Sequence, residues 1–193
     1  MMKHNVQKHL EQFLGRPQKT FYPDDRESAL KVLKFENIPT AGSVTYATSG
    51  LGEHELSLPE DVKTLQELVF AVDEKHASDD LAKLLFYVAD GVAKTRRALI
   101  RGETIDMVAE VVPGTMLTNL YVSNPTVFPA GFQSCWDTDP LTIFVWLVPL
   151  TDAEADFARI KGWNWFEKEI EKQRPNLLDA GRAGMKIPEL PSH

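Results

Sequence analysis

The chain has 193 residues, of which 43% are hydrophobic and 25% charged, values that are ordinary for a soluble globular protein of one domain. Its formal net charge of −7 argues against direct binding of nucleic acid. The single Cys135 excludes an internal disulfide, and the longest apolar run, 141–150, is too short to span a membrane, so we expect a cytoplasmic protein without a membrane segment.

The first half of the chain is predicted to contain two helices and three strands. Apolar residues recur at helical spacing from Asn5 to Leu14. The β-forming segments Leu30–Glu36 and Ser43–Thr48 are separated by turn residues and predict a hairpin-like pair. Leu65–Val72 is predicted to be a third, half-buried strand. The stretch Ser78–Ile100 carries one apolar stripe, with acids at its start and arginines at its end, and predicts a long helix.

The next part of the chain is predicted to be strand-rich. Proline residues separate three candidate strands, Thr115–Val122, Val127–Gln133 and Leu141–Val148. The last of these is almost wholly apolar, so we expect it to be a central strand that is covered on both faces.

Two helices are predicted after these strands. Thr151 and Glu154 have the spacing of a capping box, which predicts a helix from Asp152 to about Lys161 that ends at Gly162. A second helix is expected to be capped by Asn164, with Trp165, Phe166 and Ile170 on its apolar face. After it, 176–182 is expected to dock on the domain.

The order of these elements does not alternate between strand and helix, which argues against a doubly wound parallel sheet. We predict an α+β fold: an α/β sandwich in which helices pack on a mixed, largely antiparallel sheet. Residues 1–185 are predicted to form a single domain, and residues 186–193 a loose C-terminal tail.

Acidic residues are concentrated in two parts of the chain. The stretch 53–80 has nine acids against two lysines, and 102–160 has eight acids against Arg159, so each carries a net charge of −7. Between them, 81–101 is net +4. A cationic protein partner would be attracted to the acidic stretches, because complementary potentials speed encounter. The alternative is that this acidity only keeps the protein soluble.

The segment 45–56, TYATSGLGEHEL, contains the residues that most resemble a small-molecule site. Its two glycines are followed by Glu53 and Glu55, which would repel a phosphate. On an extended segment, His54 and its two flanking glutamates would point in alternate directions, so a converging metal site is not expected. The better interpretation is a strand that ends in a glycine turn with Leu51 pointing inward. A small enzyme or ligand-binding protein centred on His54 and its two glutamates remains an alternative.

No other residues form a recognisable catalytic or cofactor-binding set. Cys135 is expected to be a buried structural thiol rather than a nucleophile. The four tryptophans are expected to serve as core and interface anchors, and any exposed one could be a partner hot spot. By elimination, the chain is predicted to bind without a cofactor or metal rather than to catalyse a reaction.

Several of these motifs, taken in order, resemble one known family. Tyr46-Ala47-Thr48-Ser49-Gly50-Leu51-Gly52 is similar to the "Y-x-T-x-G-L-S" signature of suppressor-of-fused-like proteins, except that Gly52 stands where that family often has a hydroxyl residue. Glu67-Leu68-Val69-Phe70 corresponds to a following "E-L" strand. Pro149-Leu150-Thr151-Asp152-Ala153-Glu154 resembles a "P-[IL]-T-x-x-E" element, and the resemblance extends over about 30–171.

The resemblance implies an α/β sandwich without enzymatic activity. Bacterial single-domain members are expected to be immunity proteins, or antitoxins, that neutralise a secreted toxin such as a basic nuclease domain. The alternative that it implies is a scaffold that sequesters an extended segment of a partner protein. The sequence does not distinguish a monomer from a dimer. Nine residues are predicted to contact the partner: Glu53, His54, Glu55, Glu60, Asp61, Asp73, Glu74, Asp137 and Asp139.

Overall fold

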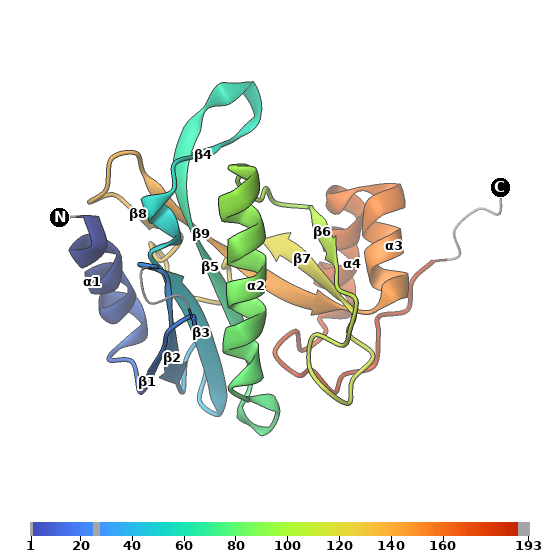
Figure 1. Cartoon of the computed structure of the whole chain (residues 1–193). Coiled ribbons are helices and arrows are strands. Elements are labelled where there is room, and N and C mark those ends of the chain that lie inside the picture. Colours follow the sequence, from blue (N-terminus) through green and yellow to red (C-terminus); the bar gives the residue numbers. More distant parts are fainter. Residues whose placement is uncertain (1, 25–27, 189–193) are drawn as a thin grey trace.

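A computed structural model describes residues 2–24 and 28–188, which form one mixed sheet with helices on both faces (Figure 1). The sheet has nine strands in the described residues, and seven of them follow one another across it. In spatial order these are β1 (Lys19–Phe21), β2 (Lys31–Glu36), β3 (Ser43–Ser49), β5 (Lys63–Asp73), β9 (Thr142–Leu150), β7 (Asn119–Ser123) and β6 (Thr104–Asp106). Two short strands, β4 (Leu56–Ser57) and β8 (Ser134–Cys135), pair with β5 and β9. The predicted α+β class is confirmed.

Only one strand pair on the main path is parallel, that of β5 with β9, in which Leu65 is opposite Thr142. The other neighbours are antiparallel, including the predicted hairpin-like pair of β2 and β3. Because β5 and β9 run in the same direction, the loops before them meet at one end of the molecule. This topology determines which acidic residues can lie together.

The helices cover the two faces of the sheet unequally. α2 (Asp80–Thr95) packs alone on one face, where its leucines join Tyr46, Leu68 and Phe70 in one apolar cluster. The other face is covered by α1 (Met2–Leu14), α3 (Asp152–Lys161) and α4 (Trp163–Gln173). β9 is the predicted central strand, since its successive residues Trp146 and Leu147 belong to the two different clusters.

Some predicted elements were wrong in position or extent. Val127–Gln133 forms turns rather than a strand, and only Ser134–Cys135 pairs with β9. The predicted strand Thr115–Val122 is shorter in the structure, because its first four residues, 115–118, lie outside β7. α2 ends at Thr95 because Arg96 adopts a left-handed conformation with φ of 54°. β5 is almost wholly buried rather than half-buried, because helices cover both of its faces.

The C-terminal helices follow the prediction more closely. The capping box at Thr151 and Glu154 is present, and α3 spans Asp152–Lys161. α4 begins two residues earlier than predicted, at Trp163, with Gly162 rather than Asn164 as its N-cap, and Trp165 is exposed rather than part of the apolar face. The following segment docks as predicted, since Leu178 and Ala180 are buried.

The end of the chain stays close to the domain as far as it is described. The Lys186 backbone exchanges hydrogen bonds with the side chain of Gln173. Within the predicted tail, residues 189–193 lie outside the described residues, so the proposed domain boundary stays a prediction. No helix in 2–24 or 28–188 is long and apolar enough to cross a membrane.

Candidate functional site

The glycine segment forms a cradle of backbone N–H donors, and a carboxyl side chain of the chain itself occupies it. Oε1 of Glu67 accepts hydrogen bonds from the backbone N–H groups of Gly50, at 2.9 Å, and Gly52, at 3.0 Å. Its other oxygen accepts from the Thr48 hydroxyl at 2.6 Å, and that hydroxyl accepts from the Leu68 N–H. Glu67 is completely buried. The N–H donors that a phosphate would need are therefore already bonded to Glu67. The same hydrogen bonds stabilise the glycine turn.

The burial and the hydrogen bonds of the Glu67 carboxyl group act in opposite directions on its pKa. Burial raises its pKa above the ordinary value, and the hydrogen bonds from Thr48 and the glycine turn oppose that shift. As predicted, the turn after β3 points Leu51 inward, where it is 1% exposed. This segment thus joins β3 to β5 rather than presenting a ligand site.

Six of the predicted partner-binding residues lie at the end of the molecule where β5 and β9 begin. The Leu65 N–H donates to the Leu141 carbonyl at 3.0 Å, so the loops before these two strands are neighbours. Glu53 and Thr138 also line the same small pocket. We call this group the acidic pole. It consists of Glu53, Glu55, Glu60, Asp61, Asp137 and Asp139.

An exposed aromatic side chain lies in one of the loops that form the acidic pole. Trp136 is 80% exposed and directly precedes Asp137, while Val62, beside Asp61, is 53% exposed. The Asn5 side chain of α1 donates to the Asp137 carbonyl and so ties this loop to the helix. Trp136 was predicted only as one of four tryptophan anchors. Its exposure was not predicted, and the structure places Trp136 in the turn that follows β8.

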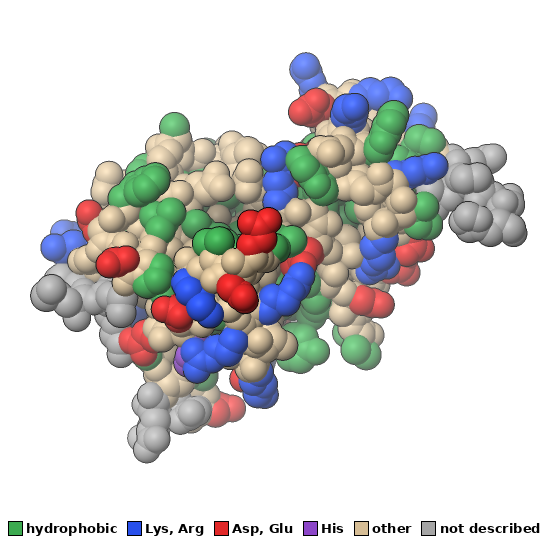
Figure 2. Space-filling view, turned by 90° about the horizontal axis from the view of Figure 1, so that it is seen from above, with side chains coloured by type: hydrophobic (Ala, Val, Ile, Leu, Met, Phe, Trp, Pro, Cys, Tyr) green, Lys and Arg blue, Asp and Glu red, His purple; other side chains and the backbone are tan. Residues whose placement is uncertain are grey.

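Basic residues border the pole on one side. Lys63 lies 3.9 Å from Glu55, and the backbone of Ser57 bonds to the backbone of Arg96 and Ala98, which places the end of α2 beside β4. Figure 2, which views the molecule from above, shows acidic and basic side chains intermixed near its centre. The acidic pole is therefore a local surface with a cationic margin rather than a uniformly negative face.

Two predicted contact residues lie far from this pole. Asp73 ends β5 and Glu74 begins the 3-10 helix η3 (Glu74–His76), at the opposite end of β5 from Asp61. The separation is roughly 35 Å along the strand at about 3.3 Å per residue. One partner surface of ordinary size would not contact both groups unless it ran along the whole sheet.

His54 lines a cavity that also includes the polar residues Ser28 and Asp90. Its side chain is half-buried, and the cavity, of about 250 Å³, is also lined by Leu30, Leu51 and Phe86. Within the described residues, no three or more His, Cys, Asp or Glu side chains are grouped as metal ligands. Cys135 is buried as predicted, and burial raises the pKa of its thiol, which disfavours the nucleophilic thiolate.

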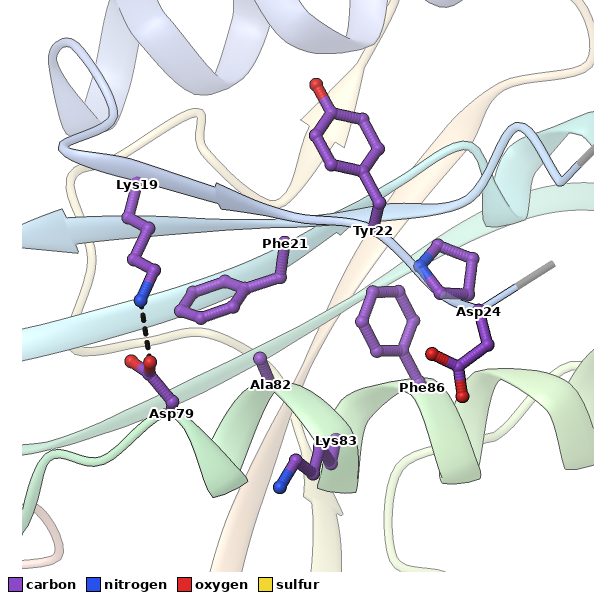
Figure 3. A pocket seen from close by; sticks show the side chains of 9 residues that line it. Lys19, Phe21, Tyr22, Asp24, Asp79, Ala82, Lys83 and Phe86 are labelled. Atoms are coloured by element: carbon purple, nitrogen blue, oxygen red, sulfur yellow. Dashed lines mark hydrogen bonds and ion pairs between the residues drawn. The ribbon is translucent and has the colours of Figure 1, made fainter. Parts of the chain in front are cut away.

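A larger groove lies between the sheet edge at β1 and the first half of α2 (Figure 3). Its volume is about 570 Å³. Phe21 from β1 and Phe86 from α2 face it, and Ala82 lies on the helix between them. One end is closed by the ion pair of Lys19 with Asp79, at 2.6 Å. Since β1 is the edge strand, this groove could accept an extended peptide beside the sheet.

Comparison with known proteins gives one family match. The model of the family described as Suppressor of fused protein (SUFU) matches residues 26–183. A search of the curated proteins finds no significant match.

Solved structures with the same fold include a SUFU homologue from Neisseria gonorrhoeae, with a TM-score of 0.78 and 18% identity over 97% of this chain and 98% of that one. The Sufu–Fu complex has a TM-score of 0.63 and 14% identity over 95% and 90% of the two chains. Drosophila Suppressor of Fused has a TM-score of 0.60 and 15% identity, with 95% of this chain matching 50% of that one.

Proposed function

The chain belongs to the suppressor of fused protein family, and we propose that it is a non-catalytic, cytoplasmic protein-binding domain that acts as an immunity protein. Its partner is a cationic toxin domain, such as a basic nuclease, which it blocks by occluding the toxin surface. The observation that carries the proposal is that acids from two distant segments, 53–61 and 137–139, lie at the same end of the molecule, with the exposed Trp136 beside the second segment.

Trp136, together with the acids of the acidic pole, has the character of a protein-binding hot spot and its charged border. Tryptophan is enriched among the residues that dominate binding energy, and surrounding charges mainly raise the association rate and exclude wrong partners. Trp136 would enter a pocket of the toxin, and the carboxylates of Asp137 and Asp139 would pair with its lysine or arginine side chains. Glu60 and Asp61 on the neighbouring hairpin would extend the contact.

Co-expression with the product of the adjacent gene tests this function. We expect that product to be toxic alone, to be neutralised by this chain and to co-purify with it. Replacing Trp136 with Ala should weaken the complex by at least about 30-fold, as expected for a hot-spot residue. If the adjacent product is harmless, or if this chain neither rescues growth nor co-purifies, the proposal is wrong.

Two matched charge-reversal variants distinguish docking at the acidic pole from attraction by the overall net charge. Asp139→Lys and Glu74→Lys change the net charge by the same amount at exposed positions on opposite ends of the sheet. We expect the first to slow association strongly and the second to leave it nearly unchanged. Equal effects of the two variants would mean that the acidic pole is not the docking surface.

Peptide capture in the groove between β1 and α2 is a second candidate function. It is favoured by the aromatic walls of Phe21 and Phe86 beside an edge strand. Phe86→Lys would abolish such capture and leave binding at the acidic pole intact. If partner binding is lost in Trp136→Ala but kept in Phe86→Lys, the result would support the immunity function.

A further inference from the structure

A second cluster of exposed apolar side chains lies where α3 meets α4, away from the acidic pole. Ile160, Trp163 and Trp165 are 56%, 38% and 60% exposed. Figure 2 shows hydrophobic and basic side chains gathered over these two helices, at the upper right. Single exposed apolar residues are ordinary, but three within six positions, two of them tryptophans, are typical of a protein-binding surface.

Trp163 is held in one orientation by its neighbours. The Arg101 guanidinium lies 4.4 Å from the centre of its ring, and the Arg101 Nε donates to Glu167 at 2.9 Å. Glu167 also accepts from the hydroxyl of the buried Tyr121. Opposite Trp163 stands Gly102, where an added Cβ would come within 2.7 Å of the tryptophan Cβ. A side chain fixed in advance loses little conformational entropy on binding.

Two lysines near the tryptophans, Lys161 and Lys168, have no acidic partner among the described residues. The Lys168 Nζ lies 4.8 Å from the centre of the Trp165 ring, and Lys161 is exposed at the C-terminal end of α3. Neither lysine forms an ion pair within the described part of the chain. Seven other lysines there do: Lys19, Lys34, Lys63, Lys75, Lys83, Lys94 and Lys172. The first turn of α4 also contains no acid.

We propose that this corner of α3 and α4 docks an acidic protein segment with an apolar side chain between its carboxylates. The apolar side chain would lie against Trp163 and Trp165, and the carboxylates would pair with Lys161 and Lys168. The site is distinct from the acidic pole. It binds an acidic segment, whereas the acidic pole binds a cationic partner. Nucleic acid and anionic membrane fit less well, because an extended polyanion would be repelled by a chain whose net charge is −7.

Synthetic peptides can test this surface directly. The probe is the acidic peptide EDLFEDLE, and its counterpart carries lysine at every acidic position. We expect saturable binding of the acidic peptide by tryptophan fluorescence and NMR shifts at α4, at least about tenfold tighter than the basic peptide. Oligo-deoxythymidine and vesicles containing anionic lipid should bind more weakly than the acidic peptide.

Two variants and one control locate the binding. Lys161→Glu with Lys168→Glu, and separately Trp165→Ala, should each weaken the acidic peptide by at least about tenfold. All three side chains are exposed, so the thermal midpoint should not change. Trp136→Ala removes an even more exposed tryptophan, which lies beside acids, and should leave binding of the acidic peptide unchanged. Absence of saturable binding, equal affinity in the lysine variant, or tighter binding of the oligonucleotide or vesicles would overturn the proposal.

Discussion

Glu67 occupies the place where a ligand of the glycine segment would have been expected. A buried carboxylate is tolerated there because the Thr48 hydroxyl and the N–H groups of Gly50 and Gly52 all donate to it. The sequence predicted the turn and the inward Leu51, and it argued against phosphate. It could not identify the occupant, since Glu67 lies 15 residues beyond Gly52 and reaches it only through strand pairing.

Removing the Glu67 carboxylate should therefore be costly. Glu67→Ala leaves three buried donors without an acceptor, and we expect a loss of roughly 3 kcal/mol in the free energy of unfolding. Urea unfolding monitored by circular dichroism measures it. Glu67→Gln, which keeps one acceptor oxygen, should lose less. A change below about 0.5 kcal/mol in the alanine variant would contradict the assigned role of this carboxylate.

The pH dependence of Glu67 has a definite sign. Its pKa is raised in the folded protein, so its contribution is fully present below the unfolded value of 4.5 and is lost as pH rises through the folded value. We expect the wild type to lose stability relative to Glu67→Gln as pH increases from 4.5 to neutral. Parallel stability curves for the two proteins would show that Glu67 does not titrate in this way.

Gly50 and Gly91 form a matched pair of glycine substitutions. Gly50 has φ of 111°, and an added Cβ would lie 2.5 Å from the Ala29 carbonyl oxygen, so Gly50→Ala should cost at least about 2 kcal/mol. Gly91 lies in α2 with nothing within 4 Å of its Cβ position, so Gly91→Ala should stabilise by up to about 1 kcal/mol. Thermal denaturation of both variants checks the opposite signs.

At the level of elements, the long periodic segments were the most predictable. α3, with its capping box, and the apolar β9 follow from local pattern alone. The edge strands β1 and β6 were not predicted, because each has three residues and depends on a neighbour for its pairing. The segment 127–133 was wrongly predicted as a strand, since its β-forming residues are interrupted by Pro129 and Gly131 and form turns instead.

One contact that joins distant elements fixes the C-terminal segment. Arg182, nearly buried, pairs with both oxygens of the fully buried Glu154 at 2.6 and 2.8 Å, and the Met185 N–H donates to the same carboxylate. Sequence alone showed Glu154 only as a capping residue. The pairing with Arg182, 28 positions later, requires the folded chain.

Arg182→Ala should leave the Glu154 charge buried without its partner. We expect a loss of about 3–5 kcal/mol in the free energy of unfolding, the range typical of breaking one side of a buried ion pair. The control is Lys172→Ala, which breaks an exposed pair with Glu169 and should change stability by less than about 1 kcal/mol. Similar effects of the two variants, measured by denaturant unfolding, would refute the assigned role of the pair.

Acid should weaken this same contact. Burial of Glu154 disfavours its charge, but the hydrogen bonds and charge of Arg182 outweigh it and lower its pKa. Its stabilisation is therefore present above the unfolded value of 4.5 and is lost as pH falls through the lower folded value. Glu154→Gln should be less stable than the wild type at neutral pH, and the gap should narrow in acid. A gap that stays constant from pH 7 to pH 3 would exclude this linkage.

At the scale of the whole molecule, topology decides which charges act together. The chain places Glu60 and Asp139 almost 80 positions apart, and the parallel pairing of β5 with β9 brings their loops to one end. The sequence identified these acids individually, but it could not separate them from Asp73 and Glu74, which β5 carries to its opposite end. Exposed Trp136 also emerged only from the folded arrangement.

The central claim is that the acidic pole around Trp136 is the surface that binds a cationic toxin. Its most direct test is the affinity of this chain for the purified product of the adjacent gene, measured by surface plasmon resonance with wild type, Trp136→Ala and Trp165→Ala at low and high salt. We predict that Trp136→Ala weakens binding by at least about 30-fold, that Trp165→Ala binds like the wild type, and that salt slows association. Unchanged affinity in Trp136→Ala, together with association that is independent of salt, would contradict the claim.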